Sequence, residues 1–308
     1  MKYANSCTMK NQKTYPWYHA QSGYDINGVT VISSWKPGPL VGIMAVTHGD
    51  EPAWMSAHRF LIDFFSNHLL SCGALFLIQW NPEAAKQGII CIDENLNRIF
   101  QEDSLLTVKQ KNSREYIRSR ELMPLLASLD YLLDIHSTGN PGPVFSILKT
   151  DDPIHREYSS ILPVEFYSIG WDDIIIGTTC DWVDAHGGVG ITIECWQHLD
   201  PYASRVAVDA AKIFLQKTGI YNFDISLFPQ SKLLQVLLKE RVIDKNTFHY
   251  KKQYMNFEAL WIDELIAQDS QKVYSVPNIQ NAVIIFPTRI ESIRSGAISE
   301  AYLLWNFL

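Results

Sequence analysis

Apolar runs of strand length, spaced through the first two-thirds of the chain, constrain the fold more than any other feature. They do not alternate with polar residues, and a run that is apolar throughout is typical of a strand buried on both faces of its sheet. The runs are LVGIMAV (40–46), GALFLIQW (73–80), YLLDIH (131–136), PVFSIL (143–148) and VGITIEC (189–195).

Helical patterns lie between these runs. Residues 52–69 begin with Pro52, which suits a first turn, and carry apolar residues three and four positions apart. Residues 202–219 repeat this pattern and stop at Gly219, which suits a left-handed C-cap, and residues 113–128 resemble a third helix. Strands that alternate with helices predict an α/β fold with a mainly parallel, mixed sheet flanked by helices. Ligands of such a sheet bind beyond the carboxyl ends of its strands.

The pattern changes near residue 222. Shorter apolar runs follow, such as KLLQVLLK, KVYSV and NAVIIFPT, and they are broken by Asn, Asp, Pro and Gly. We therefore expect a larger domain over residues 1–222 and a smaller, β-rich C-terminal domain over residues 223–308.

Composition excludes several classes of protein. The formal net charge is −7, and no cluster of Lys and Arg is present that could neutralise phosphates, so a nucleic-acid partner is not expected. The amino terminus lacks an apolar h-region and no run approaches the roughly 20 apolar residues that cross a bilayer, which predicts a soluble, cytoplasmic protein without a membrane partner. A small-molecule substrate is the expected partner, and a homo-oligomer is left open. The 5 cysteines form no C-x-x-C pair, which argues against a disulfide scaffold or a thiolate zinc site.

Common catalytic signatures are missing from the sequence. It contains no G-x-S-x-G elbow, no G-x-x-x-x-G-K-[ST] phosphate loop and no H-E-x-x-H helix. Serine hydrolases of the elbow type, P-loop proteins and zincins are therefore disfavoured.

Polar residues follow three of the predicted strands at the point where each strand ends. His48 and Glu51 come after the first run, His136 ends the third, and Glu194 ends the fifth. In a parallel sheet these side chains share one edge, where two imidazoles and a carboxylate can fill three corners of a tetrahedron. Catalytic zinc sites use such ligands and keep the fourth corner for water, so the pattern predicts one Zn²⁺ ion. We expect the other histidines to be surface or core residues.

Four motifs follow one another along the chain: HGDE (48–51), ENLNRIF (94–100), LLDIHSTG (132–139) and ITIEC (191–195). In this order they resemble the zinc carboxypeptidase-like hydrolases, most closely the branch of succinylglutamate desuccinylase and aspartoacylase. The resemblance covers about residues 35–220, and residues 282–304 are similar to the closing segment of that branch's β-rich domain.

The resemblance implies a role for each candidate residue. It makes His48, Glu51 and His136 the metal ligands and Glu194 the general base. Asn97 and Arg98 would hold a substrate carboxylate; these assignments suit their chemistry, because a carboxyl group at a strand end can carry a proton and a guanidinium fits a carboxylate bidentately. The catalytic candidate is thus Glu194, the substrate-binding candidates are Asn97 and Arg98, and the candidate metal ligands are His48, Glu51 and His136.

The sequence departs from the family pattern at several positions. Ile90 stands where an arginine binds the carboxylate of the acyl group, which argues against an acidic acyl group. Asn95 stands where an aspartate supports a ligand histidine; its amide oxygen can accept the same hydrogen bond, with Asp93, Glu94 or Asp134 as alternatives. Asp184 stands where a further arginine would contact the substrate, so recognition differs in detail.

The expected activity is zinc-dependent hydrolysis of the amide bond of an N-acyl amino acid or a similar small amide. A carboxypeptidase acting on peptides or cell-wall fragments is the alternative enzyme, although a β-rich domain that walls off the cleft favours small substrates. An inactive, ligand-binding homologue is a third possibility, which the intact set of two His and two Glu argues against.

Overall fold

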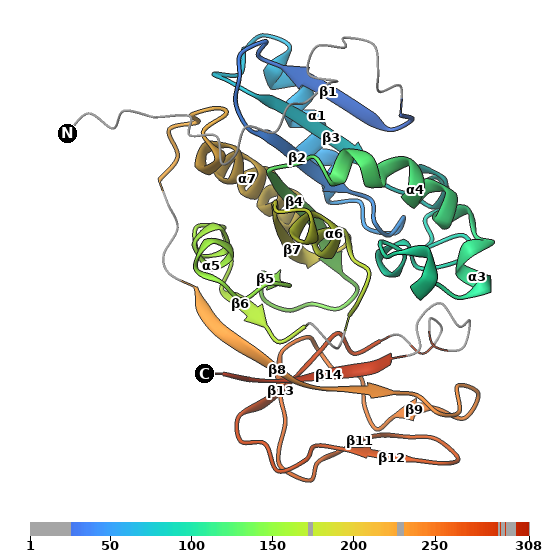
Figure 1. Ribbon diagram of the computed structural model, residues 1–308. Helices are drawn as coiled ribbons and strands as arrows, with labels where there is room; N and C mark the ends of the chain where they lie inside the picture. The colour runs from blue at the N-terminus through green and yellow to red at the C-terminus, as the bar shows by residue number, and fades with distance from the viewer. Residues whose placement is uncertain are drawn as a thin grey trace.

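The structure is a computed structural model that describes residues 26–307 except 172–174, 227–230, 289, 291–292 and 294–299. Strands alternate with helices as far as α7, and most of the elements after α7 are strands (Figure 1). The strands are β1 (Val29–Ser33), β2 (Leu40–Ala45), β3 (Ala74–Gln79), β4 (Tyr131–Thr138), β5 (Phe145–Leu148), β6 (Phe166–Ile169), β7 (Val189–Gln197), β8 (Lys232–Arg241), β9 (His249–Tyr250), β10 (Glu258–Ala259), β11 (Leu265–Gln268), β12 (Val273–Ser275), β13 (Ala282–Ile285) and β14 (Glu300–Phe307). The helices are α1 (Trp54–Phe65), α2 (Pro82–Gln87), α3 (Val108–Lys111), α4 (Arg114–Leu126), α5 (Pro153–Ser160), α6 (Thr179–Ala185) and α7 (Pro201–Thr218), with 3₁₀ turns η1 (Leu96–Arg98) and η2 (Asp103–Leu105).

The predicted α/β fold with a mixed sheet is confirmed. The large sheet has the order β1-β3-β2-β4-β7-β5-β6-β8-β14-β13-β10. Its centre is parallel, because β2 pairs in parallel with β3 and β4, and β4 pairs in parallel with β7. β5 runs antiparallel to β7. The strands that carry the predicted site are therefore spatial neighbours, and their carboxyl ends meet at one edge.

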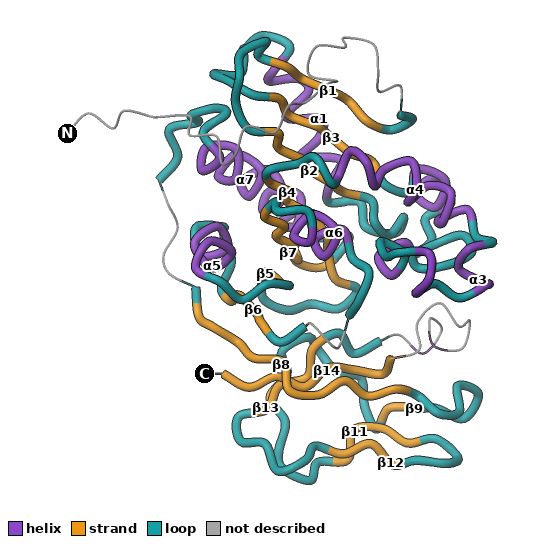
Figure 2. Tube along the Cα trace, viewed as in Figure 1, coloured by secondary structure: helices purple, strands orange, loops and turns teal. Residues whose placement is uncertain are grey.

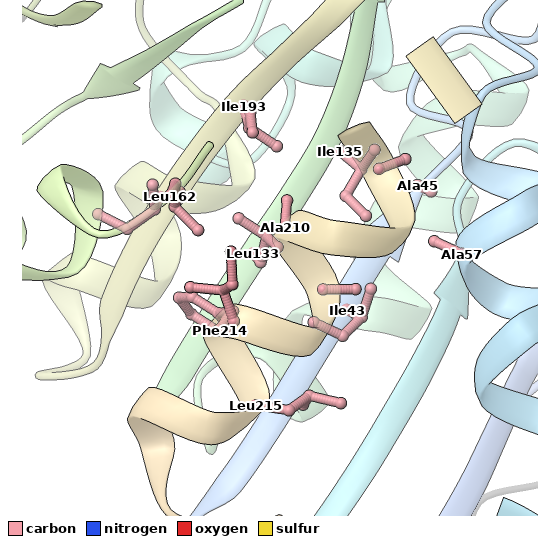
Figure 3. Packing of buried hydrophobic residues seen from close by; sticks show 14 of the residues in the cluster. Ile43, Ala45, Ala57, Leu133, Ile135, Leu162, Ile193, Ala210, Phe214 and Leu215 are labelled. Atoms are coloured by element: carbon pink, nitrogen blue, oxygen red, sulfur yellow. The ribbon is translucent and has the colours of Figure 1, made fainter. Parts of the chain in front are cut away.

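Helices cover both faces of the central strands, which explains why apolar residues lie on both faces of those strands. One face packs on α1, α5 and α7, and the other packs on α4 and α6 (Figure 2). On β4, Leu133 and Ile135 face the first layer while Leu132 faces the second. Figure 3 shows Leu133 beside Phe214 of α7; both are completely buried, and burial of such a side chain stabilises the fold by about 1.5–3 kcal/mol.

Each predicted strand and helix up to residue 219 is present with shifted ends. α1 begins at Trp54, so Pro52 lies in the turn before the helix rather than in its first turn, and α1 ends at Phe65. α7 ends as predicted, with Gly219 in the left-handed conformation at φ 80°.

The residues after β7 and α7 continue the same large sheet. β8 pairs in parallel with β6 and antiparallel with β14, so it joins the C-terminal strands to the α/β part. A separate three-stranded sheet has the order β12-β11-β9. Parts of the predicted closing segment 282–304 lie outside the described residues, as do residues 1–25 of the predicted first domain. Within the described part of the chain, no helix has the length and apolar character needed to cross a membrane.

Candidate metal centre

A strained turn places His48 and Glu51 directly after β2. Val46 adopts φ 68°, which a β-branched residue rarely does, so the chain leaves the sheet abruptly at this point. Gly49 packs so closely on α2 that an added Cβ would lie 2.2 Å from the carbonyl carbon of Ala84. The sequence therefore needs a glycine between the two candidate ligands.

His48, Glu51 and His136 lie together at the carboxyl edge of the sheet. The Nδ1 atom of His48 is 2.7 Å from Oε1 of Glu51, and the Nδ1 atom of His136 is 3.2 Å from Oε2. One donor atom from each of these three residues lies within 4.8 Å of the other two. Among the described residues, these three therefore form a group that could bind a metal ion. Three nitrogen and oxygen donors around one point suit a divalent cation such as Zn²⁺.

The charges in this cluster are mutually stabilised. Burial alone would raise the pKa of Glu51, but the imidazoles of His136 and His48 hold it well below its usual range. Burial alone would lower the pKa of His136, but the carboxylates of Asp134 and Glu51 hold it well above its usual range. The carboxylate of Glu51 is therefore ionised, as a metal ligand must be.

Two residues support the imidazoles from behind. Oδ1 of Asn95 lies 3.3 Å from Nε2 of His48, and Oδ2 of Asp134 lies 3.3 Å from Nε2 of His136. Asp93 and Glu94 form ion pairs elsewhere, with Arg114 and Lys109. Of the alternatives that the sequence left open, Asn95 and Asp134 are the residues that contact the imidazoles.

Glu194 lies on the strand next to His136. The two residues are register partners in the parallel β4–β7 pair, so their side chains point to the same face of the sheet. Glu194 is buried, and within the described residues its Oε2 atom has no hydrogen-bond partner. Burial raises the pKa of this carboxyl above its usual range. A buried carboxyl group with an unpartnered oxygen is well suited to exchange a proton with a ligand.

Asn97 and Arg98 belong to the turn η1, which follows the residue that supports His48. Asn97 is buried and its Oδ1 accepts a hydrogen bond from the backbone nitrogen of Thr179 at 3.4 Å. Arg98 is half-buried, and its Nη1 donates to the backbone oxygen of Asn97 at 2.6 Å. The Asn95–His48 contact holds this turn beside the metal cluster.

The two residues that replace family arginines have structural contacts. The backbone oxygen of Ile90 accepts from Gly49 at 3.3 Å, so its loop supports the ligand turn. Asp184 accepts hydrogen bonds from His155, Thr150 and the backbone of Gly190. Gly190 is four residues before Glu194 on β7, or about 13 Å along a strand, which separates Asp184 from the proposed base.

Several hydroxyl groups that were not predicted from the sequence lie around the cluster. Thr47 and Thr179 donate to the two oxygens of Asp134 at 3.1 and 2.7 Å. His198, expected to be a plain surface or core residue, forms a 2.8 Å contact through Nδ1 with the hydroxyl of Ser137. Thr47 directly precedes His48 and Ser137 directly follows His136, and this adjacency to candidate ligands was the sequence feature that could have identified them.

Comparison with known families agrees with this geometry. Residues 37–162 match the succinylglutamate desuccinylase/aspartoacylase catalytic domain. These residues belong to the succinylglutamate desuccinylase/aspartoacylase family. The match includes five of the predicted site residues: His48, Glu51, Asn97, Arg98 and His136. This match confirms the family predicted from the sequence motifs, which is a family of amide-bond hydrolases. Glu194 lies beyond the matched range.

Solved structures of this family share the fold. A succinylglutamate desuccinylase from Vibrio parahaemolyticus is 19% identical, with a TM-score of 0.71 over 91% of this chain and 86% of that one. The Vibrio cholerae succinylglutamate desuccinylase is 18% identical, with a TM-score of 0.70 over 91% and 85%. Murine aminoacylase 3 is 19% identical, with a TM-score of 0.63 over 89% and 96%. A search of curated proteins by sequence found no match.

Proposed function

We propose that this protein is a zinc-dependent hydrolase that cleaves the amide bond of an N-acyl amino acid or a similar small amide. The convergence of His48, Glu51 and His136, with one donor atom each within 4.8 Å, is the observation that carries the proposal. Membership of residues 37–162 in a family of amide-bond hydrolases supports it.

The donor set fits zinc. Two imidazole nitrogens and one carboxylate oxygen are a common ligand set of catalytic zinc, and both imidazoles have a hydrogen-bonding or charged partner on the ring nitrogen that faces away from Glu51. One Zn²⁺ bound by these residues would supply Lewis-acid chemistry and lower the pKa of a coordinated water.

Glu194 is the proposed general base. Its buried carboxylate would accept a proton from the attacking water at Oε2 and return it to the nitrogen of the leaving amine. Its pKa is raised in the absence of a cation, and a divalent cation at the neighbouring cluster would lower that pKa toward the range in which the group is ionised.

Asn97 and Arg98 are proposed to bind the carboxylate of the substrate. The guanidinium of Arg98 offers a planar fork for two carboxylate oxygens, and the amide of Asn97 adds one more donor. Substrate binding and bond cleavage would thus be served by separate side chains.

We also retain the division into a catalytic domain (1–222) and a β-rich domain (223–308) as a proposal. The amide of Asn140, two residues after β4, donates to the backbone oxygen of Pro287 at 2.9 Å. The β-rich part is thus attached close to the strand that carries His136. A β-rich part beside the metal centre would narrow the access to it, and this favours small amides over long peptides.

The test is metal analysis of the purified protein followed by an activity screen. We expect one zinc per chain and release of amino acid from N-acyl amino acids, with little cleavage of short peptides. Faster cleavage of peptides would favour the carboxypeptidase alternative. Zinc binding without turnover of either class would favour the ligand-binding alternative, and failure to bind any divalent metal would refute the proposal.

A further inference from the structure

Thr179 makes two hydrogen bonds in different directions from a completely buried position. It is the first residue of α6, and its Oγ1 donates to Oδ2 of Asp134 at 2.7 Å. Its backbone nitrogen donates to Oδ1 of Asn97 at 3.4 Å. The same residue is therefore bonded to both the metal side and the substrate side of the candidate site.

The metal side of this connection is short. Oδ2 of Asp134, which accepts the Thr179 hydroxyl, is also the atom that lies 3.3 Å from Nε2 of His136. A hydrogen bond to one oxygen of a buried carboxylate fixes the orientation of that carboxylate. Asp134 in turn attracts the ring of His136 as an ion-pair partner, and the other ring nitrogen of His136 faces Glu51.

The substrate side is supported by backbone packing. Phe100 donates its backbone N–H to the oxygen of Gly177 at 3.0 Å, and a Cβ on Gly177 would lie 2.7 Å from the backbone oxygen of Arg98. The start of α6 therefore lies directly along the turn that carries Asn97 and Arg98. The bond from Thr179 to Oδ1 orients the amide of Asn97. The Nδ2 group at the other end of that amide can then donate to a substrate carboxylate.

We propose that Thr179 is a positioning residue that sets His136, through Asp134, and Asn97 at the same time. This inference rests on the proposed function, because it assigns Thr179 a role in holding the zinc ligand and the substrate-binding amide of that reaction. α6 is short, and the Thr178–Asp181 capping box fixes its start, so both bonds of Thr179 come from a rigid point.

The decisive comparison is Thr179→Val against Thr179→Ser. Valine keeps the branched shape and loses the donor to Asp134, whereas serine keeps the donor. For Thr179→Val we expect zinc affinity, measured by chelator competition on the metal-free protein, to fall about tenfold, the lower end of the range for groups that support a ligand. We also expect KM to rise for the N-acyl amino acid that wild-type protein cleaves fastest, because residue 179, no longer held by Asp134, can shift its backbone N–H away from Asn97. Both quantities should be restored in Thr179→Ser.

Two control variants separate this role from a general weakening of the structure. Thr47→Val removes the donor to the other oxygen of Asp134 and has no bond to Asn97, so it should lower zinc affinity and leave KM unchanged. Thr178→Ala removes the side-chain cap of α6 but keeps the Thr179 hydroxyl, so it should lower Tm while zinc affinity falls less than in Thr179→Val. Wild-type zinc affinity in Thr179→Val, or equal impairment in Thr179→Ser, would overturn the inference. Wild-type protein that binds no zinc would overturn the proposed function and this inference with it.

Discussion

The Nε2 atom of His48 lies 3.3 Å from the Oδ1 atom of Asn95, so an amide supports this imidazole at the position where the family resemblance implies a carboxylate. The contact leaves Nδ1 of His48 directed at Glu51, 2.7 Å away. An amide oxygen fixes the orientation of the ring as a carboxylate does. It carries no charge, however, and therefore raises the basicity of the imidazole less.

This relationship predicts that zinc affinity depends on the residue at position 95. Asn95→Ala should weaken zinc binding about 10–100-fold, because the ring of His48 loses its support. Asn95→Asp should bind zinc at least as tightly as the wild type, because a carboxylate strengthens the ligand. Chelator competition measures both. Equal affinities for all three proteins would show that the contact does not influence the metal.

The proposed general base predicts a loss of turnover without a loss of metal. Glu194→Gln keeps the size of the side chain and removes its ability to accept a proton, so kcat should fall about 10²–10⁴-fold. Zinc content, measured on the same sample, should stay at the wild-type level because Glu194 is not a proposed ligand. Substantial activity in this variant would remove Glu194 from the mechanism.

Arg98 is predicted to act on substrate binding. Arg98→Ala should raise KM about 10–100-fold, because a hydrogen bond to a charged group contributes about 1.5–3 kcal/mol. Arg98→Lys keeps the charge but loses the planar fork, so its KM should lie between those of Arg98→Ala and the wild type. An N-acyl amine without the carboxylate is the matched substrate. If Arg98→Ala impairs cleavage of both substrates equally, Arg98 does not bind the carboxylate.

Gly49 is predicted to be essential for the ligand turn. An added Cβ would meet backbone atoms of Ala84 and Ala85 at 2.2 and 2.4 Å, which cannot move aside as a flexible side chain can. Gly49→Ala should therefore lower both Tm and zinc affinity. Gly88→Ala is the control: it strains a left-handed residue by about 1–2 kcal/mol, but nothing lies within 4 Å of the new Cβ. Only its Tm should fall.

His155 predicts a pH-dependent contribution to stability away from the metal cluster. Burial alone would lower the pKa of His155, but Asp184 on α6 and Asp152 before α5, at 3.1 and 3.0 Å, raise it above its usual value. The folded state thus holds the proton more tightly than the unfolded chain, whose histidine pKa is about 6.5. This contribution is fully present below that pH and is lost as the pH rises through the folded-state value.

The measurement is the Tm of the wild type and of His155→Gln at pH 5.5 and pH 9. The variant should lose more Tm at pH 5.5, where wild-type His155 is charged between its two aspartates. An equal loss at both pH values would mean that the imidazole stabilises this region through packing alone.

Local patterns were sufficient to predict the long elements. β2, β4 and β7 were predictable because a parallel strand buried on both faces is mostly apolar, and α7 was predictable from its periodicity and from Gly219. α6 was not predicted, since 7 residues are too few for a clear helical period. β6 was not predicted because it is only partly buried and lacks the continuous apolar run that marked the equally short β5. Their ends depend on caps and on pairing with neighbouring strands.

The sequence by itself determined the type of sheet, the edge at which ligands gather, and the residue types able to bind a metal, because these follow from local periodicity and side-chain chemistry. Only the tertiary structure decided that Asp134 and Asn95 support the imidazoles, that Asp184 binds His155, and that Thr179 lies between Asp134 and Asn97. Except for Asp134 and His136, which are two residues apart on β4, the physical reason is distance along the chain. Contacts between residues tens of positions apart depend on how strands pair and helices pack, and no local pattern records that arrangement.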